Sequence, residues 1–486
     1  MSSIILATLN ARYSHASLGL RYLLANMGAL QAQTEVVEFV INSNPAEIVE
    51  VLLDRQPRII GLSVSIWNVE ETTRVVALLK QVAPEVTVVL GGPEVSHEYD
   101  RQTIVQLADY LIPGPADLAF GQLCQRILGG DRPAQKVISP EPVALDRISL
   151  PYRLYSEEDI AHRLVYVEAS RGCPFKCEFC LSSLDKSVQT FDPDLFLAEM
   201  RILHQRGVRK FKFVDRTFNL NIKSSLRILE FFLERLDDQL FLHFEVVPDH
   251  LPAKLRVTIA RFPPGSLQFE IGIQTFNPEV QALINRKQDD DKTEENVRWL
   301  REHSHAHIHA DLIIGLPGED VASFARGFNR LVAMGPHEIQ VGILKRLRGT
   351  SLDRHSDRFG IRYSPDAAYT ILCSDLIDFN TLQGLTRFAR YWEMVANTGR
   401  FSHTLPLLLG SDPFARFLRF ADWLYATTRQ THRIALERLF DLIQQWLTEE
   451  GGMDAVTTLA ALVRDYQASG ARGRPKCMAA APRWQA

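Results

Sequence analysis

Three cysteines stand close together near the middle of this 486-residue sequence. Cys173, Cys177 and Cys180 have the spacing C-x3-C-x2-C and follow the apolar run 164–169, which has the character of a buried strand. A loop this short directs several thiolates at one centre, which is how proteins hold iron–sulfur clusters. Three ligands leave one iron of a four-iron cluster without a protein thiolate. The spacing therefore predicts a cluster with an open coordination site.

A structural zinc site and a disulfide are the alternatives for these cysteines. Zinc takes four ligands, usually as two C-x2-C-like pairs, and the remaining cysteines, Cys124, Cys373 and Cys477, are isolated and distant. A disulfide is less favoured, because the chain has only 6 cysteines and we find no signal peptide at its start. The cluster remains the favoured interpretation.

The cysteine motif resembles that of the radical S-adenosylmethionine (SAM) superfamily. That family has C-x3-C-x2-C with an aromatic residue before the last cysteine, the position that Phe179 fills. The resemblance implies a 4Fe-4S cluster whose open iron binds the amino and carboxylate groups of SAM. One electron, from an external donor such as flavodoxin or ferredoxin, then cleaves the sulfonium to give a 5′-deoxyadenosyl radical. Phe179 is accordingly a candidate SAM contact.

Length, composition and charge limit the other possibilities. The chain is long enough for about three domains. Its 46% hydrophobic content is that of a globular protein, and its net charge of −4 gives no electrostatic footprint for nucleic acid. No apolar run approaches the roughly 18 residues of a membrane span. We expect a cytoplasmic protein without nucleic-acid or membrane partners, a location that suits an oxygen-labile cluster.

Residues 1–140 alternate short apolar runs with segments of helical spacing. The runs are 4–9, 35–40, 59–65 and 87–90. Continuous apolar strands alternating with helices predict a flavodoxin- or Rossmann-like, doubly wound parallel sheet. Ligands of such sheets bind at the carboxyl ends of the strands. The loops expected to matter are 10–17, 63–67, 91–96 and 113–117.

A Gly-Gly-Pro-Glu segment stands in one of these loops. Its glycines let the backbone approach a ligand closely, although a plain tight turn is the default for such a pair. Because it precedes a cluster motif, the domain resembles the cobalamin-binding domain of the cobalamin-dependent radical SAM family. That resemblance makes seven residues candidate cobalamin contacts: Ser63, Ser65, Trp67, Gly91, Gly92, Pro93 and Glu94.

The D-x-H-x-x-G motif, which supplies a lower histidine ligand in many cobalamin proteins, is missing from this sequence. His15 in the first loop has Tyr13 and Leu18 where that motif needs Asp and Gly. A solvated loop position is the commoner case for such a histidine. Members of the resembled family often lack this ligand, so its absence does not exclude cobalamin.

A proline-containing linker or interdomain strap, 141–163, precedes a second series of strands and helices. The expected strands are 164–169, 210–214, 241–246, 266–271, 307–313 and 338–343. Six strand–helix units over 164–355 fit a parallel, partly closed, TIM-like barrel of (β/α)6 type, the fold that the resembled family uses. Chemistry in such barrels takes place at the carboxyl ends of the strands, where the cysteine loop falls.

Four further strand-end residues are candidate SAM contacts. Asp215 follows the second strand, although a helix or turn cap is about as common for this residue type. Glu270 and Gln274 belong to an apolar strand, and a buried carboxylate needs a partner. The resemblance suggests that both contact SAM. The segment 311–319 matches the family's D-L-I-x-G-L-P-G-E, which would bring the backbone of Gly315 near adenine.

A row of histidines precedes that segment. His303, His305, His307 and His309 alternate at period two, which places them on one face of a strand. No matched carboxylate supports a metal site there. We expect a polar start of the strand.

The last third of the chain has helical spacing. We expect a helical domain over 356–466 that acts as a lid or substrate-selecting cap, with Asp378, Tyr391 and Trp392 as candidates for reaching over the barrel mouth. The tail 467–486 is small, basic and rich in Pro and Gly, so we expect disorder there.

The leading hypothesis is a cobalamin-dependent radical SAM enzyme. It would act on a small molecule, with methyl transfer to an unactivated carbon as the commonest outcome in the resembled family. The alternatives are a radical SAM enzyme without cobalamin, catalysing a cyclisation or rearrangement, and a non-catalytic iron–sulfur sensor.

Overall fold

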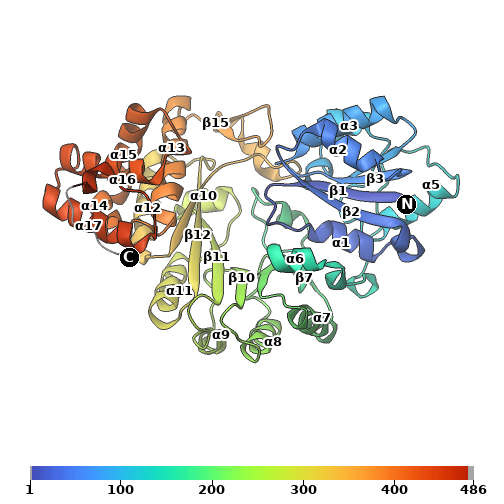
Figure 1. Cartoon of the computed structure of the whole chain (residues 1–486), viewed down its shortest axis with the longest axis horizontal. Helices are drawn as coiled ribbons and strands as arrows, with labels where there is room; N and C mark the ends of the chain where they lie inside the picture. The colour runs from blue at the N-terminus through green and yellow to red at the C-terminus, as the bar shows by residue number, and fades with distance from the viewer. Residues whose placement is uncertain (1–2, 480–486) are drawn as a thin grey trace.

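The computed structural model describes residues 3–479, which form three parts in chain order (Figure 1). A doubly wound α/β domain comes first, an open parallel barrel follows, and a helical domain comes last. The barrel lies between the other two parts (Figure 1). The predicted fold class is confirmed, while the exact domain boundaries stay predictions.

The N-terminal sheet has the strand order β2-β1-β3-β4-β5, and its pairings are parallel. The strands are β1 (Ile4–Asn10), β2 (Thr34–Val40), β3 (Ile59–Ser63), β4 (Thr87–Gly91) and β5 (Tyr110–Leu111). One face is covered by α2 (Pro45–Leu53), α3 (Val69–Val82) and α4 (Thr103–Leu107), and the other by α1 (Leu18–Ala25) and α5 (Ala119–Leu128). The strand order reverses between β1 and β3, where open sheets of this kind bind ligands.

Six parallel strands form the barrel in chain order: β6 (Val165–Val167), β9 (Lys210–Phe213), β10 (Phe241–Val246), β11 (Leu267–Gln274), β12 (His307–Ile314) and β13 (Glu338–Ile343). Within residues 3–479, β6 and β13 do not pair, so the barrel is open. The predicted strands 241–246 and 338–343 begin and end at the observed residues. β11 runs three residues further than predicted, to Gln274.

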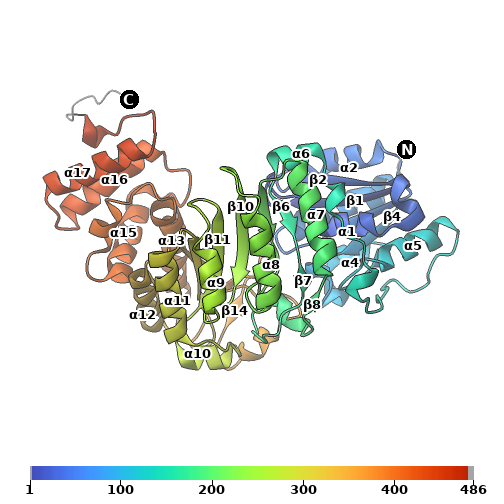
Figure 2. The same cartoon turned by 90° about the horizontal axis from the view of Figure 1, so that it is seen from below.

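Helices cover the outer face of the barrel sheet. They are α7 (Pro193–Gln205), α8 (Ile222–Leu233), α9 (Ala253–Ile259), α11 (Asp290–His303) and α12 (Val321–Met334). The short helix α10 (Pro278–Leu283) lies instead at the carboxyl ends of the strands (Figure 2). Figure 2 shows α7, α8, α9 and α11 side by side along this face. On β11 the alternate residues Leu267, Phe269 and Ile271 are buried in this helix-facing core. Glu270, between them, lies on the opposite side of the strand, in the barrel lumen.

Side chains occupy the two open edges of the barrel. At β6 the hydroxyls of Tyr152 and Tyr155 donate to the carbonyl oxygens of Glu168, at 2.9 Å, and Tyr166, at 2.7 Å. At β13 the N–H of Ile339 donates to Asn397 Oδ1, and Asn397 Nδ2 donates to the Ile339 carbonyl, both at 3.0 Å. Unpaired strand edges invite pairing with other chains, so these contacts protect both edges.

The segment predicted as a linker is packed rather than loose. Tyr152 and Tyr155 are fully buried, and helix α6 (Glu157–His162) begins with a capping box between Ser156 and Asp159. Asp159 also forms a buried ion pair with Arg21 of the N-terminal domain. The segment therefore acts as a structured brace between the first two domains.

The helical domain contains α13 (Phe379–Trp392), α14 (Leu405–Leu409), α15 (Pro413–Thr428), α16 (Leu436–Glu449) and α17 (Ala455–Ala468), preceded by the two-stranded pair β14 (Arg362–Tyr363) and β15 (Ile371–Cys373). Tyr391 and Trp392 are buried in its aromatic core, and Asp378 caps α13 by accepting from the N–H of Thr381 at 2.9 Å. The prediction that these three side chains reach over the barrel mouth is wrong, because packing and capping occupy them.

The C-terminal tail is ordered as far as the structure describes it. After α17 a 3-10 helix forms over Lys476–Met478, Met478 is buried, and the N–H of Cys477 donates to Asp441 at 2.8 Å. The prediction of disorder is wrong for 467–479, since composition does not show that α16 offers these contacts. Residues 480–486 lie outside the described residues. Among the helices of residues 3–479, none has the length and apolar character that crossing a membrane requires.

Replacement of Arg21 by methionine should destabilise the N-terminal domain. Arg21 is 4% exposed and pairs with Glu38 at 2.9 Å and Asp159 at 2.6 Å, so its loss leaves buried carboxylates undercompensated. We expect the free energy of unfolding, measured by chemical denaturation, to fall by about 3–5 kcal/mol. The exposed pair of Arg126 and Asp131 supplies the control, because solvent screens this pair and Arg126→Met should leave the free energy of unfolding nearly unchanged. Equal losses in the two variants would contradict this account.

Candidate cluster and cofactor sites

The three cysteines lie on a tight loop after β6. The strands β7 (Ser170–Arg171) and β8 (Gln189–Thr190) pair and fold the segment 184–188 back over this loop. Gly172 has φ of +90°, and a Cβ on it would lie 1.6 Å from the carbonyl oxygen of Ser187. The N–H of Cys173 donates to the carbonyl of Asp185 at 3.2 Å. Only glycine fits at position 172, and the backbone alone fixes the start of the loop.

A buried carboxylate anchors the other side of the cysteine loop. Glu178 is 5% exposed, and its N–H donates to the carbonyl of Ile284, at the end of α10, at 3.0 Å. Its carboxylate accepts from Arg354 Nε at 2.8 Å and pairs with His355 at 3.0 Å. The loop is thus tied to two distant parts of the barrel.

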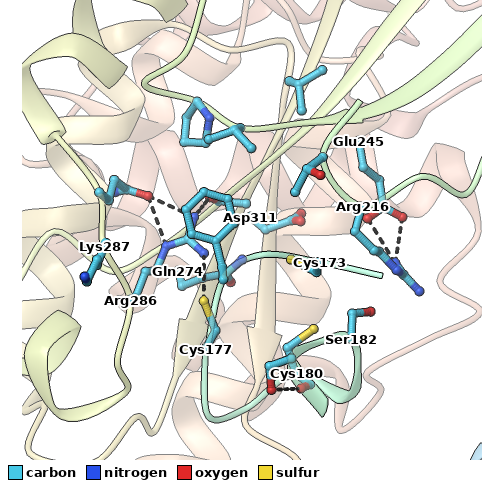
Figure 3. Close-up of a pocket in the computed structure, with 18 of the residues that line it drawn as sticks. Cys173, Cys177, Cys180, Ser182, Arg216, Glu245, Gln274, Arg286, Lys287 and Asp311 are labelled. Atoms are coloured by element: carbon cyan, nitrogen blue, oxygen red, sulfur yellow. Dashed lines mark hydrogen bonds and ion pairs between the residues drawn. The ribbon is translucent and has the colours of Figure 1, made fainter. Parts of the chain in front are cut away.

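All three cysteines line one cavity at the carboxyl ends of the barrel strands, which we call the SAM cavity (Figure 3). Charged and polar side chains from the neighbouring strand ends and loops line it as well, among them Arg216, Glu245, Gln274, Arg286 and Asp311. Burial raises the pKa of the Cys173 and Cys177 thiols above the usual value for cysteine. A bound metal would oppose that effect, because coordination favours the thiolate.

The cysteines fit a cluster better than a single ion. In residues 3–479 no group of three or more His, Cys, Asp or Glu side chains is arranged to hold one metal ion. A four-iron cluster binds each thiolate through a different iron, so its ligands share a cavity without converging on one point. Arg286 Nη1 lies 3.9 Å from the sulfur of Cys177 (Figure 3), where a cation would face a thiolate.

The end of β11 is irregular. Gln274 has φ of +72°, rare for a residue with a Cβ, and the pairing with β12 shifts register between Gly272 and Gln274. A Cβ on Gly272 would lie 2.5 Å from Gln274 Nε2, so glycine leaves the space that this side chain fills. The Gly272 carbonyl accepts a hydrogen bond from Arg286. The bulge directs both Gln274 and Arg286 into the SAM cavity (Figure 3).

Three of the five predicted SAM contacts, Phe179, Glu270 and Gln274, line this cavity. Asp215 and Gly315 do not. Asp215 is 3% exposed, lies on the outer side of the cysteine loop, and its burial raises its pKa to about 7. Its carboxylate accepts from the N–H of Ala169 at 3.0 Å and the hydroxyl of Ser170 at 2.5 Å. Asp215 therefore supports the backbone before the cysteines instead of facing a ligand.

Gly315 lies beneath β15 rather than at the cavity. Its φ is +90°, and a Cβ there would lie 2.9 Å from the side chain of Ile371. The close packing of the helical domain's small sheet on the end of β12 accounts for this glycine. Its predicted contact with adenine does not match this position.

Glu270 is part of an ionic cluster in the lumen. It pairs with His243 Nε2 at 2.9 Å and Lys212 Nζ at 3.4 Å. The hydrogen bond from His243, with help from Lys212, lowers the pKa of Glu270 to about 2 despite burial. Glu270 is therefore ionised at neutral pH, and neighbouring strands already satisfy part of its hydrogen-bonding capacity.

Of the four histidines in the row, His307 and His309 lie on β12 and form a second lumen cluster, whereas His303 is the last residue of α11, so the row does not share one strand. His309 contacts Asp311 at 3.2 Å and Glu338 at 3.1 Å, and His307 contacts Glu338 at 2.9 Å. Burial disfavours a charged imidazole, yet these carboxylates raise the pKa of His309 to about 10. Asp311 then continues the row to the wall of the SAM cavity.

Sequence analysis missed Arg216, Glu245, Arg286 and Asp311. Arg216 Nη1 donates to both carboxylate oxygens of Glu245, at 2.8 and 2.9 Å, at the cavity wall (Figure 3). Asp311 could have been found, because it continues the period-two row of His307 and His309. Arg286 follows a short helix, and no pattern in its neighbourhood marks it.

A second cavity, of about 490 Å³, lies between the N-terminal domain and the barrel. We call it the interdomain cavity. Of the predicted cobalamin contacts, Ser63, Gly91, Gly92 and Pro93 line it. Gly92 has φ of +105°, and a Cβ on it would lie 2.4 Å from the carbonyl oxygen of Val64. The glycine is needed for the turn that borders the cavity.

The other three predicted cobalamin contacts, Ser65, Trp67 and Glu94, do not line the interdomain cavity. The N–H of Ser65 donates to Asn68 Oδ1 at 2.8 Å, and Trp67 is 52% exposed. Glu94 accepts from Arg348 Nε at 2.7 Å and from the hydroxyl of Tyr369 at 2.8 Å. Local turn packing and an ion pair with a distant segment account for these positions.

His15 does not reach the interdomain cavity either. Its ring Nδ1 contacts the hydroxyl of Tyr166 on β6, and its backbone bridges to Leu164. The expected solvated loop position is wrong, because this histidine lies at the contact between domain and barrel. No histidine is among the described residues that line the interdomain cavity.

Arg171 joins the two cavities. Its guanidinium donates to both oxygens of Asp117 at 3.0 and 3.1 Å and to Glu168 at 2.8 Å, and lies 4.5 Å from the ring centre of Tyr22. Glu168 and Arg171 line the interdomain cavity, whereas Cys173, two residues later, lines the SAM cavity. The segment 168–173 is therefore a wall shared by both.

Replacement of Gly172 by alanine should prevent cluster assembly. The Cβ has no room beside Ser187, so the cysteine loop has to move. Gly130 supplies a matched control, because its φ of +91° is similar but nothing lies within 4 Å of an added Cβ. After anaerobic reconstitution we expect Gly172→Ala to lack bound iron and visible absorbance, and Gly130→Ala to keep both. Normal iron content in Gly172→Ala would contradict this role.

Stability should fall with rising pH through His309. Its pKa lies at about 10 in the folded chain and near 6.5 otherwise. The ion pairs therefore contribute fully below pH 6.5, and their contribution is lost as pH rises towards 10. In His309→Gln, chemical denaturation should show a flatter dependence of stability on pH over this range. The exposed His432 supplies the control, and His432→Gln should keep the original slope. An unchanged slope in His309→Gln would count against the assignment.

Comparison with known proteins adds three family matches. Residues 4–123 match the B12 binding domain, residues 167–330 the radical SAM superfamily, and residues 357–483 a family described as a protein of unknown function, DUF4080. The helical domain thus corresponds to the third match, while the two cavities are formed by the first two.

Three proteins are similar to most of the described chain. An uncharacterized methyltransferase, PH0819, of Pyrococcus horikoshii is 24% identical over 62% of this chain and 70% of its own length. The cobalamin-dependent radical SAM methyltransferase TokK of Streptomyces tokunonensis is 24% identical over 65% of this chain, which spans about half of TokK, 51%. The solved structure of TsrM from Kitasatospora setae, with cobalamin and a [4Fe-4S] cluster, aligns with a TM-score of 0.61 over 97% of this chain and 100% of its own, at 15% identity.

At such low identity the structural match concerns the fold, so the likeness to a family rests on the two domain matches. They confirm the predicted resemblance, because the cysteine loop lies in the radical SAM match and the glycine turn in the B12-binding match. The chain therefore resembles radical SAM proteins that carry a cobalamin (B12)-binding domain, because it contains a match to each of these two domains.

Proposed function

We propose that this chain is a cobalamin-dependent radical SAM methyltransferase that acts on an unactivated carbon of a small molecule. One observation carries the proposal: the segment 168–173 has the SAM cavity on one side and the interdomain cavity on the other. Two cofactors held against a shared wall lie close enough to act on one substrate.

The relatives favour methyl transfer over the alternatives. PH0819, TokK and TsrM are each named as methyltransferases, and the latter two as cobalamin-dependent or cobalamin-bound. A radical SAM enzyme without cobalamin is less favoured, because the B12-binding match covers nearly the whole first domain. A sensor without turnover is less favoured, because the SAM cavity contains more polar side chains than a cluster needs as ligands.

The chemistry of the SAM cavity suits SAM. The carboxylate of SAM requires a cation, and the Arg286 guanidinium lies beside Cys177 at the cavity wall. Ribose hydroxyls require acceptors, which the Gln274 amide and the Asp311 carboxylate supply. Phe179 adds apolar surface next to the last cysteine. These contacts are proposals drawn from the type and place of each side chain.

The interdomain cavity suits a corrinoid. Leu6 and Phe120 give its sheet side an apolar lining, while Gly91 and Gly92 let a large ligand approach the backbone. Glu168 and Arg171 form the wall towards the barrel. Since no described histidine lines this cavity, we propose that cobalamin binds here without a protein imidazole on cobalt.

When bound, the cluster and SAM supply a 5′-deoxyadenosyl radical that takes a hydrogen atom from the substrate, and cobalamin supplies the methyl group. The chain's own residues position these groups and shield them from water. The paired Arg216 and Glu245 close one side of the SAM cavity. We propose that the substrate is a small molecule, that an external protein supplies electrons, and that the enzyme works in the cytoplasm, where an oxygen-labile cluster is best protected.

Anaerobic reconstitution tests this function. We expect the purified chain, supplied with iron, sulfide and hydroxocobalamin, to retain corrinoid absorbance and to release 5′-deoxyadenosine and S-adenosylhomocysteine from SAM and a reductant. Cys177→Ala should lose 5′-deoxyadenosine formation, whereas Cys373→Ala, outside the cysteine loop, should keep it. No 5′-deoxyadenosine from the intact chain would rule out the enzyme. 5′-Deoxyadenosine without retained corrinoid would leave the cobalamin-free alternative.

A further inference from the structure

A third cavity, of about 460 Å³, opens on the outer side of the cysteine loop. We call it the outer groove. It lies between the hairpin of β7 and β8 and the start of α8, and its lining includes Ser170, Pro174, Val188, Thr190, Leu220 and Ile222. Apart from Ser170, whose hydroxyl donates to Asp215, none of these side chains has a part in the sites described above.

The cysteine loop is a thin wall between the outer groove and the SAM cavity. Cys173 lines the SAM cavity, and the next residue, Pro174, lines the outer groove. In the proposed function SAM and substrate fill the SAM cavity, so an electron donor has to reach the cluster from another side. A protein seated in the outer groove would stand one residue from a cluster ligand.

The surroundings of the outer groove combine apolar and basic residues. Val188 and Leu184 are 47% and 42% exposed. Lys176, Lys186 and Lys223 are exposed as well, and in the part of the chain that the structure describes none of the three forms an ion pair. An apolar centre with an unpaired charged rim is typical of a surface that binds another protein.

The nearby carboxylates do not cancel this charge pattern at the groove. The Asp185 carboxylate accepts from the N–H of Ser187 at 3.0 Å and from its hydroxyl at 2.6 Å. Asp215, at the base of the groove, is buried and bonded to Ala169 and Ser170. Asp185 is exposed and keeps its negative charge, because its hydrogen-bond donors are neutral, so three exposed lysines face this one exposed carboxylate and leave an excess of positive charge.

We propose that the outer groove docks an acidic one-electron carrier protein of the flavodoxin or ferredoxin class. The inference rests on the proposed function, in which each SAM cleavage consumes one electron. The donor loses one electron and the cluster gains it, with no bond formed or broken at the groove. Lysines opposite an acidic partner would steer the encounter and orient it, as is typical of short-lived redox complexes.

Reversal of two of these charges tests the docking. The variant Lys186→Glu/Lys223→Glu leaves the residues between the cysteines intact. Its matched control is Lys210→Glu/Arg261→Glu, an equal charge change at the opposite end of the barrel strands, where β9 begins and α9 has ended. The probe is fluorescently labelled flavodoxin, titrated at low salt against the cluster-loaded chain. We expect its affinity to fall at least tenfold in the first variant and less than twofold in the control.

Cluster reduction gives the second measurement, followed by absorbance without SAM. Flavodoxin hydroquinone should reduce the Lys186→Glu/Lys223→Glu cluster at least tenfold more slowly, while dithionite reduces it at the original rate. Unchanged flavodoxin affinity, or an equal loss in the control, would overturn the proposal. If dithionite reduction also falls, Lys223→Gln decides, since this residue lies on α8 and outside the cysteine loop: weaker flavodoxin binding supports the docking, and unchanged binding overturns it. Because neither measurement involves SAM, failure of methyl transfer remains distinguishable from failure of docking.

Discussion

The bidentate ion pair between Arg171 and Asp117 fixes the position of the two cofactor sites relative to each other. Arg171 belongs to the wall before Cys173, and Asp117 belongs to the loop after β5 of the N-terminal domain. Glu168 and the ring of Tyr22 complete the surroundings of the guanidinium. A largely buried charge is stable only when its partners stay in place. Any shift of the first domain would separate this pair, so the spacing between the cavities is fixed by contact rather than by chain connectivity.

The parts of this arrangement that depend on local pattern could be predicted from the sequence. Apolar runs of strand length predicted the barrel strands, and residue spacing alone predicted the cysteine loop. Gln274 was found as a polar residue in an apolar strand, yet its left-handed backbone was not, because a register shift against β12 produces it. Arg286 was missed for a similar reason. Its importance comes from the Gly272 carbonyl and the Cys177 sulfur, which lie far from it in sequence.

Glu94 shows the limit of reasoning from a motif. Its place after two glycines predicted a ligand contact, but its carboxylate pairs with Arg348 and Tyr369, more than two hundred residues later. No local pattern reveals such a partner. Glu98 in the same loop pairs with Arg346 at 2.9 Å, so the loop after β4 binds the segment after β13. Together with the contact at Arg171, which follows β6, these pairs attach the N-terminal domain next to both edge strands of the open barrel.

An open barrel has a physical cost that explains the flanking parts. Six strands leave room beside the lumen for large cofactors, but they also leave two edges with unpaired backbone groups. Tyr155 donates to the β6 edge, and Asn397 exchanges two hydrogen bonds with Ile339 on β13. Tyr155 lies in the segment between the first two domains, and Asn397 follows α13. The brace and the helical domain therefore do at the edges what further strands would do in a closed barrel. They protect the sheet while the described barrel stays open between β6 and β13.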